Sequence, residues 1–349
     1  MKDNGLDEVG RWSAEELLLR AAWFYYKDEL TQDEVAKRLS VSRASVGRLL
    51  DRARRVGLVT INLNADYLDS FHLSAELRHT FGLSEALVVP DIEKEPSDRH
   101  ALNGRIGLGG AQFISTHLRP GAALGVGWGE TVSRVIAATN FGAVGPVHMV
   151  TLTGGVDGYL PTILSSKGES SSAAQVITAS VIPAPITASS AELAAALRAE
   201  PTIQQVIKQA CGVEQAVVGV GTPSTDATIV QLGYLTAADA ATLRAQGVVG
   251  DILGQFFDAD GRVAELAIHD RRIGIELSDL RHVQKVVGVA GGLHKAKAIL
   301  GALRGGFLDV LVTNEVTAIR LLELDRKAAR ASGRRPLPAA LNRRPRPRR

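Results

Sequence analysis

Hydrophobic side chains in the first sixty residues recur every three or four positions, a spacing that predicts helices. The first predicted helix begins at Ser13, and two further helices are predicted over residues 32–39 and 43–55. Residues 57–63 then alternate between apolar and polar side chains, which predicts a short strand forming a small wing. The inward face of the third helix is predicted to consist of Val46, Leu49, Leu50 and Ala53.

Each of these helices is preceded by a residue that can cap its N-terminus. Ser13 and Thr31 are each followed three residues later by a glutamate, which is the pattern of a capping box. Ser42 lies directly before the third helix and ends a tight turn over residues 40–42. Two short helices joined by such a turn, the second of them basic, are typical of a helix-turn-helix DNA-binding domain.

Positive charge is concentrated in the same segment. Between Lys37 and Arg55 the chain has seven basic residues and one acidic residue, Asp51. A local positive patch is typical of proteins that bind the phosphate backbone of DNA, and a helix face solvated by water is the ordinary alternative. The first turn of the third helix would read base edges, and Lys37 would bind phosphate. The residues expected to contact double-stranded DNA are Gln32, Lys37, Ser42, Arg43, Ala44, Ser45, Arg48 and Arg52.

Beyond residue 85 the pattern changes to short apolar runs separated by helical stretches. Because these runs contain few alternating polar residues, the predicted strands are buried on both faces. This order predicts an α/β domain with a Rossmann-like parallel sheet covered by helices on both faces. Strands are predicted over residues 85–90, 122–128, 148–154, 215–221, 285–292 and 309–314. Helices are predicted near residues 99–118, 130–139, 169–180, 190–210, 236–246, 294–304 and 315–330.

The chain of 349 residues is long enough for two domains. We predict a helix-turn-helix domain over residues 1–64, a linker helix over 65–84 and a ligand-binding domain over 85–330. The tail over 331–349 contains seven arginines and no acidic residue, and it is predicted to be disordered. The single cysteine, Cys211, favours a reducing cytoplasmic location. The sequence contains no run of eighteen apolar residues, so no membrane span is predicted.

Several predicted strands end in glycines, and the clearest case is GVGWGET over residues 125–131. Glycines there let backbone N–H groups approach a ligand, and the start of the next helix attracts anions. The stretch lacks the Gly-Lys-Ser/Thr of a P-loop, and glycine-rich turns without a ligand are the alternative. Thr131 is expected to donate its hydroxyl to the anion, whereas Glu130 has to turn away from it. The strand-end candidates are Gly127, Trp128, Gly129, Glu130, Thr131, Gly154, Gly155, Gly291 and Gly292.

Two charged residues are candidates for completing such a site. Lys295 is predicted in the first turn of a helix, where the helix dipole disfavours a cation, and a bound anion would explain that placement. A surface lysine that reaches water is the alternative. Asp251 precedes a hairpin-like turn over residues 258–261, and it either faces a ligand or caps its own turn. No His, Cys, Asp or Glu cluster has metal-ligand spacing, so we expect neither a metal nor a cofactor.

The stretch LTQDEVAKRLSVSRASVGRLLDRARRVGLVTI over residues 30–61 resembles the DNA-binding head of the SorC/DeoR-type family of bacterial sugar-binding transcriptional regulators. The stretches GVGWGET, LTGG, GDILGQFFDADG and VVGVAGGLHKAKAILGALRGGFLDVLVTNEVTAIRLLEL are similar to the family's effector domain. The resemblance extends over about residues 13–325. It implies a fold similar to sugar-phosphate isomerases, and a homotetramer built as a dimer of dimers. Operator DNA and a phosphorylated sugar effector are the implied partners.

The resemblance also implies roles for individual residues. Residues 127–131 would form the phosphate loop, Asp251 would meet sugar hydroxyls, and Lys295 would meet the phosphate or the sugar. The chain departs from the family at Asn314, where many relatives have an aspartate. That difference puts the identity of the ligand in doubt.

Two functions from different classes fit this sequence. The first is a transcriptional regulator of a carbohydrate catabolism operon that is controlled by a sugar effector. The alternative is a sugar-phosphate isomerase or deaminase with an accessory DNA-binding head, and DNA binding without any small ligand is a third possibility. An isomerase needs a positioned base, and the candidates, Asp251, His294 and Glu315, form no clustered acidic motif. We therefore expect a protein that is not an enzyme, in which the ligand shifts the arrangement of the oligomer.

Overall fold

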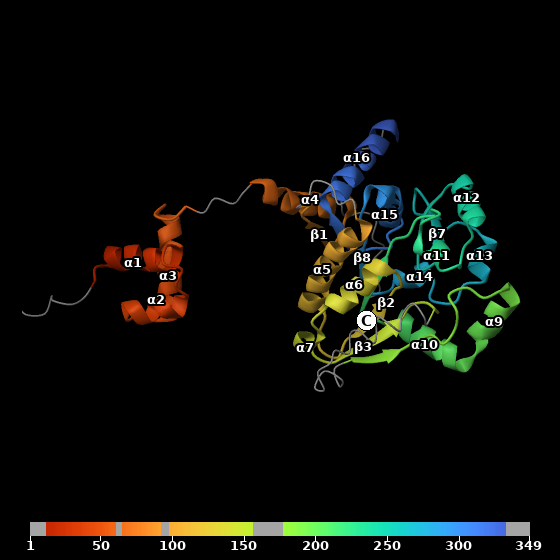
Figure 1. Cartoon of the computed structure of the whole chain (residues 1–349), viewed down its shortest axis with the longest axis horizontal. Helices are drawn as coiled ribbons and strands as arrows, with labels where there is room; N and C mark the ends of the chain where they lie inside the picture. Colours follow the sequence, from red (N-terminus) through yellow and green to blue (C-terminus); the bar gives the residue numbers. More distant parts are fainter. Residues whose placement is uncertain (1–11, 61–64, 92–97, 156–176, 333–349) are drawn as a thin grey trace, which may run out of the picture. The chain divides into compact units, whose positions relative to one another are not determined.

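The computed structural model describes residues 12–60, 65–91, 98–155 and 177–332. The contacts within the chain divide it into two compact units, Met1–Ala65 and Asp66–Arg349 (Figure 1). Within the described residues, the smaller unit consists of helices, and the larger unit is built around a parallel sheet.

The helices of the smaller unit are α1 (Ala14–Tyr26), α2 (Gln32–Leu39) and α3 (Arg43–Arg55). All three begin at the predicted caps. The Ser13 hydroxyl accepts a hydrogen bond from the Glu16 N–H at 3.2 Å, and the Glu16 carboxylate accepts one from the Ser13 N–H at 3.0 Å. Thr31 and Glu34 form the same reciprocal pair, and Ser42 caps α3. These contacts satisfy N–H groups that a helix start otherwise leaves without partners.

A small hydrophobic core of buried side chains from α1, α2 and α3 holds the three helices together. The core consists of Ala21, Val35, Ala36, Leu39, Val46 and Leu50.

The turn between α2 and α3 begins at Ser40, which has a left-handed backbone with φ of 57°. The predicted strand over residues 57–63 is absent from residues 57–60, and residues 61–64 lie outside the described ranges. No other strand occurs in the described part of this unit, so these residues have no partner for strand hydrogen bonds.

The larger unit contains a seven-stranded sheet in the order β1-β9-β8-β5-β2-β3-β4. Its strands are β1 (Glu85–Val89), β2 (Ala123–Val126), β3 (Val147–Thr151), β4 (Ile177–Ser180), β5 (Gln215–Gly219), β8 (Lys285–Val289) and β9 (Val310–Asn314). All of the pairings are parallel; Val126, for example, pairs with Val217 on one side and Thr151 on the other. The predicted parallel sheet and its six predicted strands are confirmed.

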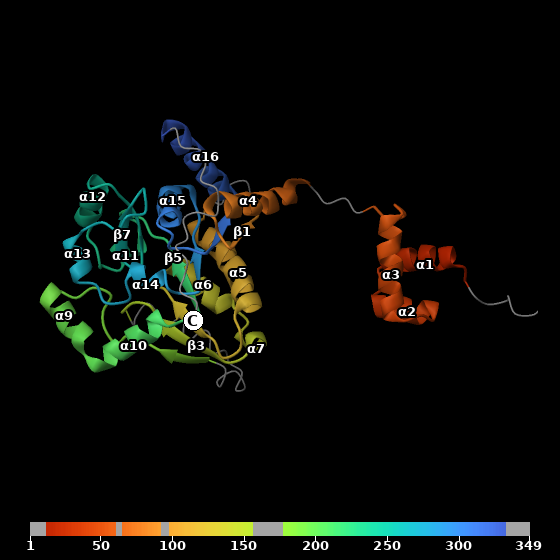
Figure 2. The same cartoon turned by 180° about the vertical axis from the view of Figure 1, so that it is seen from behind.

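Helices cover both faces of the sheet (Figures 1 and 2). Those on one face are α5 (Arg99–His117), α6 (Glu130–Ala138) and α7 (Phe141–Val144), and they pack against side chains such as Leu124 and Val287. Those on the other face are α4 (Ala65–Phe81), α10 (Pro201–Cys211), α15 (Ala296–Arg304) and α16 (Glu315–Ser332), and they pack against Val218 and Leu311. Successive residues of each strand therefore contribute to two separate cores.

An antiparallel hairpin of β6 (Val248–Ile252) and β7 (Gln255–Asp258) lies outside the main sheet. Leu253 and Gly254 form its turn with φ values of 55° and 74°. An antiparallel bridge between Gly221 and Asp251 joins the hairpin to the chain that follows β5. The remaining short helices are α9 (Ala191–Ala199), α11 (Thr228–Gln231), α12 (Ala237–Ala245), α13 (Ala267–Asp270), α14 (Leu277–Leu280) and η2 (Leu293–Lys295).

The prediction of a helix over residues 169–180 is wrong. Residues 177–180 form β4, and residues 169–176 lie outside the described ranges. Ile177 and Thr178 are β-branched, which suits a strand, and both pair with β3 at the edge of the sheet. Pairing with this edge outweighs the weak helical pattern of small residues in the sequence.

The helix predicted over residues 190–210 is divided into α9 and α10. Pro201 occupies the first turn of α10, where its missing N–H costs nothing. The proline forces the preceding residue, Glu200, into extended backbone with φ of −63° and ψ of 129°. The first helix therefore ends before residue 200.

Two glycines of α5 let this helix approach α6 closely. A Cβ atom at Gly107 would lie 2.7 Å from the Arg134 Cβ, and one at Gly110 would lie 2.7 Å from a Val135 methyl group. Real side chains do not tolerate such contacts, so the separation of the helices depends on the absence of side chains here. This approach places the first turns of α5 beside the N-terminus of α6.

We predict that Gly110→Ala destabilises the protein by about 1–3 kcal/mol, because the new methyl group overpacks the contact with Val135. Gly104→Ala is the matched control on the same helix, since a Cβ there has no neighbour closer than 3.9 Å. The control is expected to stabilise α5 by about 0.5–1 kcal/mol through helix propensity. Denaturant unfolding measures both changes, and equal effects of the two variants would contradict the packing argument.

Candidate ligand-binding site

A pocket lies at the carboxyl ends of β2 and β5. These strands are neighbours, but the chain leaves β2 towards β3 on one side and β5 towards β8 on the other. Open α/β sheets bind ligands at such a switch point. The pocket is lined by residues 128–132, 219–222 and 227–229 and by Arg99, Asn103, Asp251, Leu253 and Lys295. Of the predicted residues it therefore brings together Trp128, Gly129, Glu130, Thr131, Asp251 and Lys295.

The loop between β2 and α6 depends on two glycines. The Gly127 N–H donates to the Val217 carbonyl at 2.8 Å, and a Cβ at residue 127 would lie 2.9 Å from that oxygen. Gly127 thus packs against β5 and does not line the pocket. Gly129 has a φ of 115° and precedes α6 without a side-chain cap, which leaves the N-terminal turn of α6 suited to an anion.

The Glu130 carboxylate is held by polar groups on two helices. It accepts a hydrogen bond from the Asn103 amide at 2.9 Å and lies 2.6 Å from His100 Nδ1 and 3.1 Å from Arg134 Nη2. Burial raises the pKa of this carboxyl, but these contacts outweigh burial and hold the pKa below its ordinary value. Three partners thus take up the charge that sequence reasoning found awkward beside an anion.

The Thr131 hydroxyl was expected to donate to the bound anion. In the structure it is buried and donates to the Asn103 side-chain oxygen at 3.1 Å. Asn103 therefore links Thr131 to Glu130 and fixes the first turn of α6 against α5. The first turn of α6 therefore faces the pocket with its backbone, while the side chains of Glu130 and Thr131 hold the turn in place through Asn103.

Asp251 is 4% exposed and lies at the end of β6, next to the hairpin turn. Its Oδ2 accepts a hydrogen bond from the Gly254 N–H at 3.2 Å, so Asp251 caps a turn, but the one at residues 253–254 and not the predicted one at 258–261. A Cβ at Gly221 would lie 2.0 Å from its Oδ1, so only glycine leaves room for the carboxylate. Burial raises the pKa of Asp251 to about 6, and the Gly254 N–H and Lys295 oppose this rise.

Lys295 ends the short helix η2 and reaches the same pocket. Burial, with help from the neighbouring charge of Arg99, lowers the pKa of Lys295 to about 8. The carboxylates of Asp251, Glu130 and Asp226 oppose this shift. The pocket thus has a buried carboxylate and a half-buried ammonium group, and the pKa values of both are displaced towards neutrality.

Arg99 and Asn103 are functional candidates that sequence reasoning missed. Arg99 lines the pocket from the first turn of α5, and its Nη1 donates to the Asp226 carbonyl and carboxylate at 3.1 Å each. Its place in a first turn gives the same signal as Lys295, a cation at the helix end that disfavours it. Asn103 gives no such signal, because only the contact between α5 and α6 brings it to the site.

Besides Gly127, four predicted strand-end glycines lie outside the pocket lining and serve close packing. Gly154 donates its N–H to the Ile273 carbonyl at 3.0 Å, and Gly155 donates to the Ala184 carbonyl at 2.7 Å. A Cβ at Gly291 would lie 2.4 Å from Ile106, and the Gly292 N–H donates to the Thr317 hydroxyl at 2.7 Å. In the structure the N–H groups of Gly154, Gly155 and Gly292 donate to the protein itself.

Asn314, at the end of β9, joins three segments. Its amide nitrogen donates to the Asp91 carboxylate at 2.8 Å, and its oxygen accepts hydrogen bonds from the Thr317 hydroxyl at 2.6 Å and from the Gly292 N–H at 3.3 Å. An aspartate here would bring a second carboxylate against Asp91. The asparagine therefore complements Asp91 and supports the turn after β8.

The residues predicted to contact DNA lie on α2 and α3 of the smaller unit. Arg48 donates to the Ser45 hydroxyl at 3.2 Å, and Arg43 forms an exposed ion pair with Asp33 at 3.4 Å. Exposed members of this set are Lys37, Ser42, Arg43, Ala44, Arg48 and Arg52, and the half-buried members are Gln32 and Ser45.

Among the described residues, no group of three or more His, Cys, Asp or Glu side chains is arranged to hold a metal ion. In the same part of the chain, no helix has the length and apolar character needed to cross a membrane.

A parallel sheet with a polar pocket at its switch point and a separate three-helix unit defines a class of ligand-binding regulators. A family model described as "Putative sugar-binding domain" matches residues 65–323. The chain belongs to the SorC/DeoR-type family of sugar-binding transcriptional regulators.

Relatives in this family match nearly the whole chain. The transcriptional regulator LsrR of Enterobacter sp. (strain 638) is 39% identical over 333 residues, which cover 93% of this chain and 99% of that protein. LsrR of Escherichia coli (strain K12) is 36% identical over 326 residues, covering 92% and 99%. The full-length sorbitol operon regulator SorC of Klebsiella pneumoniae has a TM-score of 0.66 at 26% identity, with 89% of this chain and 100% of that chain covered.

We predict that Asp251→Asn stabilises the protein at neutral pH, because it removes a buried charge. In the folded protein the pKa of Asp251 is raised to about 6 from 3.8. The protonated carboxyl therefore contributes its full share to the stability of the fold below pH 3.8, and this stability is lost as pH rises through 6. The advantage of the variant should therefore shrink by about 1 kcal/mol between pH 7.5 and pH 5. Urea unfolding at both pH values tests this, and an advantage independent of pH would contradict it.

Proposed function

We propose that this chain binds operator DNA through α2 and α3 and is controlled by a phosphorylated sugar bound in the pocket. The observation that carries the proposal is the convergence of Arg99, Lys295 and the uncapped start of α6 around one pocket that also contains a buried carboxylate. Cations and helix N-termini bind phosphate, and a buried carboxylate accepts hydrogen bonds from hydroxyl groups. One ligand with both groups satisfies the whole site.

The phosphate is proposed to lie against Gly129, Thr131 and the following backbone N–H groups, with Lys295 and Arg99 beside it. Lys295 is available because, among the described residues, it takes part in no ion pair. Arg99 is already engaged by Asp226 and would share its charge with the ligand. The sugar is proposed to lie between Trp128 and Asp251, whose Oδ1 faces the Gly221 backbone.

The DNA contacts are proposed to follow the exposed residues of α3. Arg43, Ala44, Ser45 and Arg48 would read base edges from the first turns, and Arg52 would bind phosphate together with residues of α2. The Arg43–Asp33 ion pair is exposed, so phosphate or a base can replace Asp33 at little cost.

The pocket is proposed to sense its ligand without changing it. Asp251 and Lys295 have pKa values suited to proton transfer, but the other carboxylate that lines the pocket, Glu130, is engaged by His100, Asn103 and Arg134. The relatives are named transcriptional regulators, which supports a regulatory role.

We further propose a cytoplasmic homotetramer, arranged as a dimer of dimers, whose quaternary arrangement shifts when the ligand binds. The proposed domain limits remain 1–64, 65–84, 85–330 and 331–349.

A gel-shift assay with DNA upstream of the chain's own gene tests the proposal as a whole. The complex is titrated with a panel of phosphorylated and free sugars, and the ligand is recovered and analysed after each titration. At least one sugar phosphate is expected to alter the shift and to be recovered unchanged. Consumption of that compound would support an enzyme, and no response to any sugar phosphate would refute the proposed effector.

Arg48→Ala is expected to weaken operator binding by about 1–3 kcal/mol, roughly 5- to 150-fold, while leaving sugar-phosphate binding intact. Arg20→Ala is the matched control, because it removes one charge from the same unit at α1, where the guanidinium lies over the Trp12 ring. Fluorescence anisotropy with labelled operator measures both variants at one salt concentration. Operator affinity equal to that of the control would place Arg48 outside the DNA contact.

Sugar-phosphate binding is expected to weaken as pH rises through about 8, where Lys295 loses its proton. The phosphate remains a dianion above about pH 6, so its own charge does not change in this range. Calorimetric titrations from pH 7 to 9.5 should show this decline in affinity for the native protein. The Lys295→Gln variant should bind more weakly at pH 7, and its affinity should change less with pH. Lys297→Gln, an exposed neighbour on α15, is the control. A decline shared by Lys295→Gln would argue against this role.

A further inference from the structure

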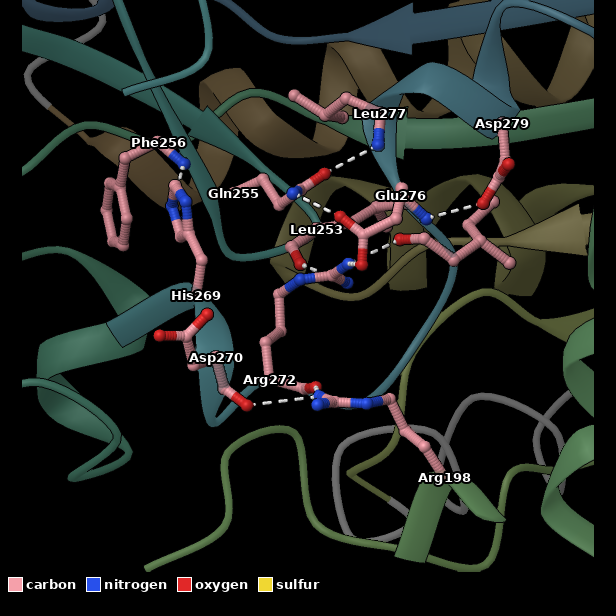
Figure 3. A network of polar contacts seen from close by, with 11 residues as sticks. Arg198, Leu253, Gln255, Phe256, His269, Asp270, Arg272, Glu276, Leu277 and Asp279 are labelled. Atoms are coloured by element: carbon pink, nitrogen blue, oxygen red, sulfur yellow. Dashed lines mark hydrogen bonds and ion pairs between the residues drawn. The ribbon is translucent and has the colours of Figure 1, made fainter. Parts of the chain in front are cut away.

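The segment over residues 269–277 holds the β6–β7 hairpin through hydrogen bonds to Leu253, Gln255 and Phe256 (Figure 3). His269 Nε2 accepts a hydrogen bond from the Phe256 N–H at 2.9 Å, and the Gln255 side-chain oxygen accepts one from the Leu277 N–H at 2.5 Å. Burial lowers the pKa of His269 to about 4, so this ring is a neutral acceptor at physiological pH. Successive residues of the hairpin are thus bound by side chains and backbone of one segment.

Arg272 is the centre of this arrangement and is only 3% exposed. Its Nη2 donates to the Ile275 carbonyl and to the Glu276 carboxylate, both at 2.7 Å, and its Nη1 points to the Leu253 carbonyl at 3.4 Å. Figure 3 shows the guanidinium between the hairpin turn and Glu276. The aliphatic part of Arg272 lies beneath Gly254, where its Cδ would be 3.5 Å from an added Cβ.

The ion pair is poorly explained as a source of stability. Burying a guanidinium is costly, and the Glu276 side chain is 53% exposed, so water weakens the attraction between the two charges. The Nε of Arg272 is also buried without a hydrogen-bond partner in the described structure. An apolar side chain of similar length would fill this space without either cost, so the guanidinium is better explained by what it orients.

The oriented element is the turn that fixes Asp251. Leu253 has a positive φ of 55°, which costs energy for a residue with a side chain, and its own side chain lines the pocket. The next residue, Gly254, donates the N–H that holds the Asp251 carboxylate. A contact that restrains the 253–254 turn therefore restrains both Leu253 and the carboxylate.

We propose that Arg272 is a positioning residue that sets the orientation of the Asp251 carboxylate and thereby the selectivity for a sugar phosphate over phosphate alone. Arg198 supports it, because its Nη1 donates to the backbone carbonyls of Asp270 at 3.1 Å and Arg272 at 2.6 Å. The functional part of this inference rests on the proposed sugar-phosphate site. Its structural part concerns the hairpin itself and is tested without ligand.

The ligand test compares Arg272→Met with the native protein, using inorganic phosphate and the sugar phosphate that gives the strongest gel-shift response. Affinity for the sugar phosphate should fall about tenfold, the loss expected for one hydrogen bond to a charged group, while phosphate affinity stays within about twofold. Arg272→Lys, which retains a buried cation, should bind the sugar phosphate with an affinity between those of the native protein and Arg272→Met. Arg304→Met is the matched control, because Arg304 also donates to a carbonyl, that of Ala259 just after β7, and pairs with a carboxylate, that of Asp325 on α16.

A double variant identifies the route of the effect. In an Asp251→Asn background, Arg272→Met should change sugar-phosphate affinity by less than about twofold, because the carboxylate it positions is gone. A full tenfold loss in that background would overturn the inference, as would equal losses for phosphate and the sugar phosphate. If the native protein shows no preference for any sugar phosphate over phosphate, the proposed function fails and the selectivity role fails with it.

Amide hydrogen exchange tests the structural part in the protein without ligand. Arg272→Met should increase exchange at Gly254 and Phe256 at least tenfold relative to Val217 and Val287 in the sheet core. A purely structural role would raise exchange in the hairpin and the sheet alike. Uniform change, or protection of Gly254 and Phe256 equal to that in Arg304→Met, would overturn the inference whatever the ligand results.

Discussion

The pocket depends on how closely α5 and α6 approach each other. Gly107 and Gly110 remove the side chains that would separate the helices, and the first turn of α6 is then fixed by Asn103 from α5. Asn103 reaches both Thr131 and Glu130, so one amide group orders two consecutive residues of the first turn of α6. Arg99 enters the pocket as a result of the same approach. A packing constraint in the middle of a helix thus determines the chemistry at its end.

Asp251 and Lys295 show what the fold gives up to keep a ligand site ready. Burial raises the pKa of Asp251 to about 6 and lowers that of the half-buried Lys295 to about 8, and the two groups form no direct ion pair in the described structure. A core designed for stability alone would hold apolar side chains at such positions. In the proposed function, a ligand with a negatively charged part and a hydroxyl-bearing part would offset this free energy on binding, as function commonly does for destabilised sites.

The sequence allowed the sheet, most of its helices and the caps of the head to be predicted, because short apolar runs and capping boxes are local signals. It failed at residues 169–180, where pairing with β3 decides the structure, and at Pro201, whose effect on Glu200 was overlooked. For the site, residues 128–131 of the predicted loop and Lys295 could be found from strand-end glycines and helix dipoles, whereas Gly127 packs against β5. Asn103 could not, since its partners are 27 and 28 residues away and meet it only through helix packing.

The lysine at the end of η2 has a consequence for how such a sensor responds inside a cell. With a pKa of about 8, a fraction of Lys295 is neutral at physiological pH, and a bound dianion favours the protonated form. If the proposed phosphorylated ligand binds beside Lys295, its binding takes up protons, and its apparent affinity depends on pH. A regulator with this pocket would integrate the supply of its metabolite with the acidity of its surroundings, using a single ammonium group.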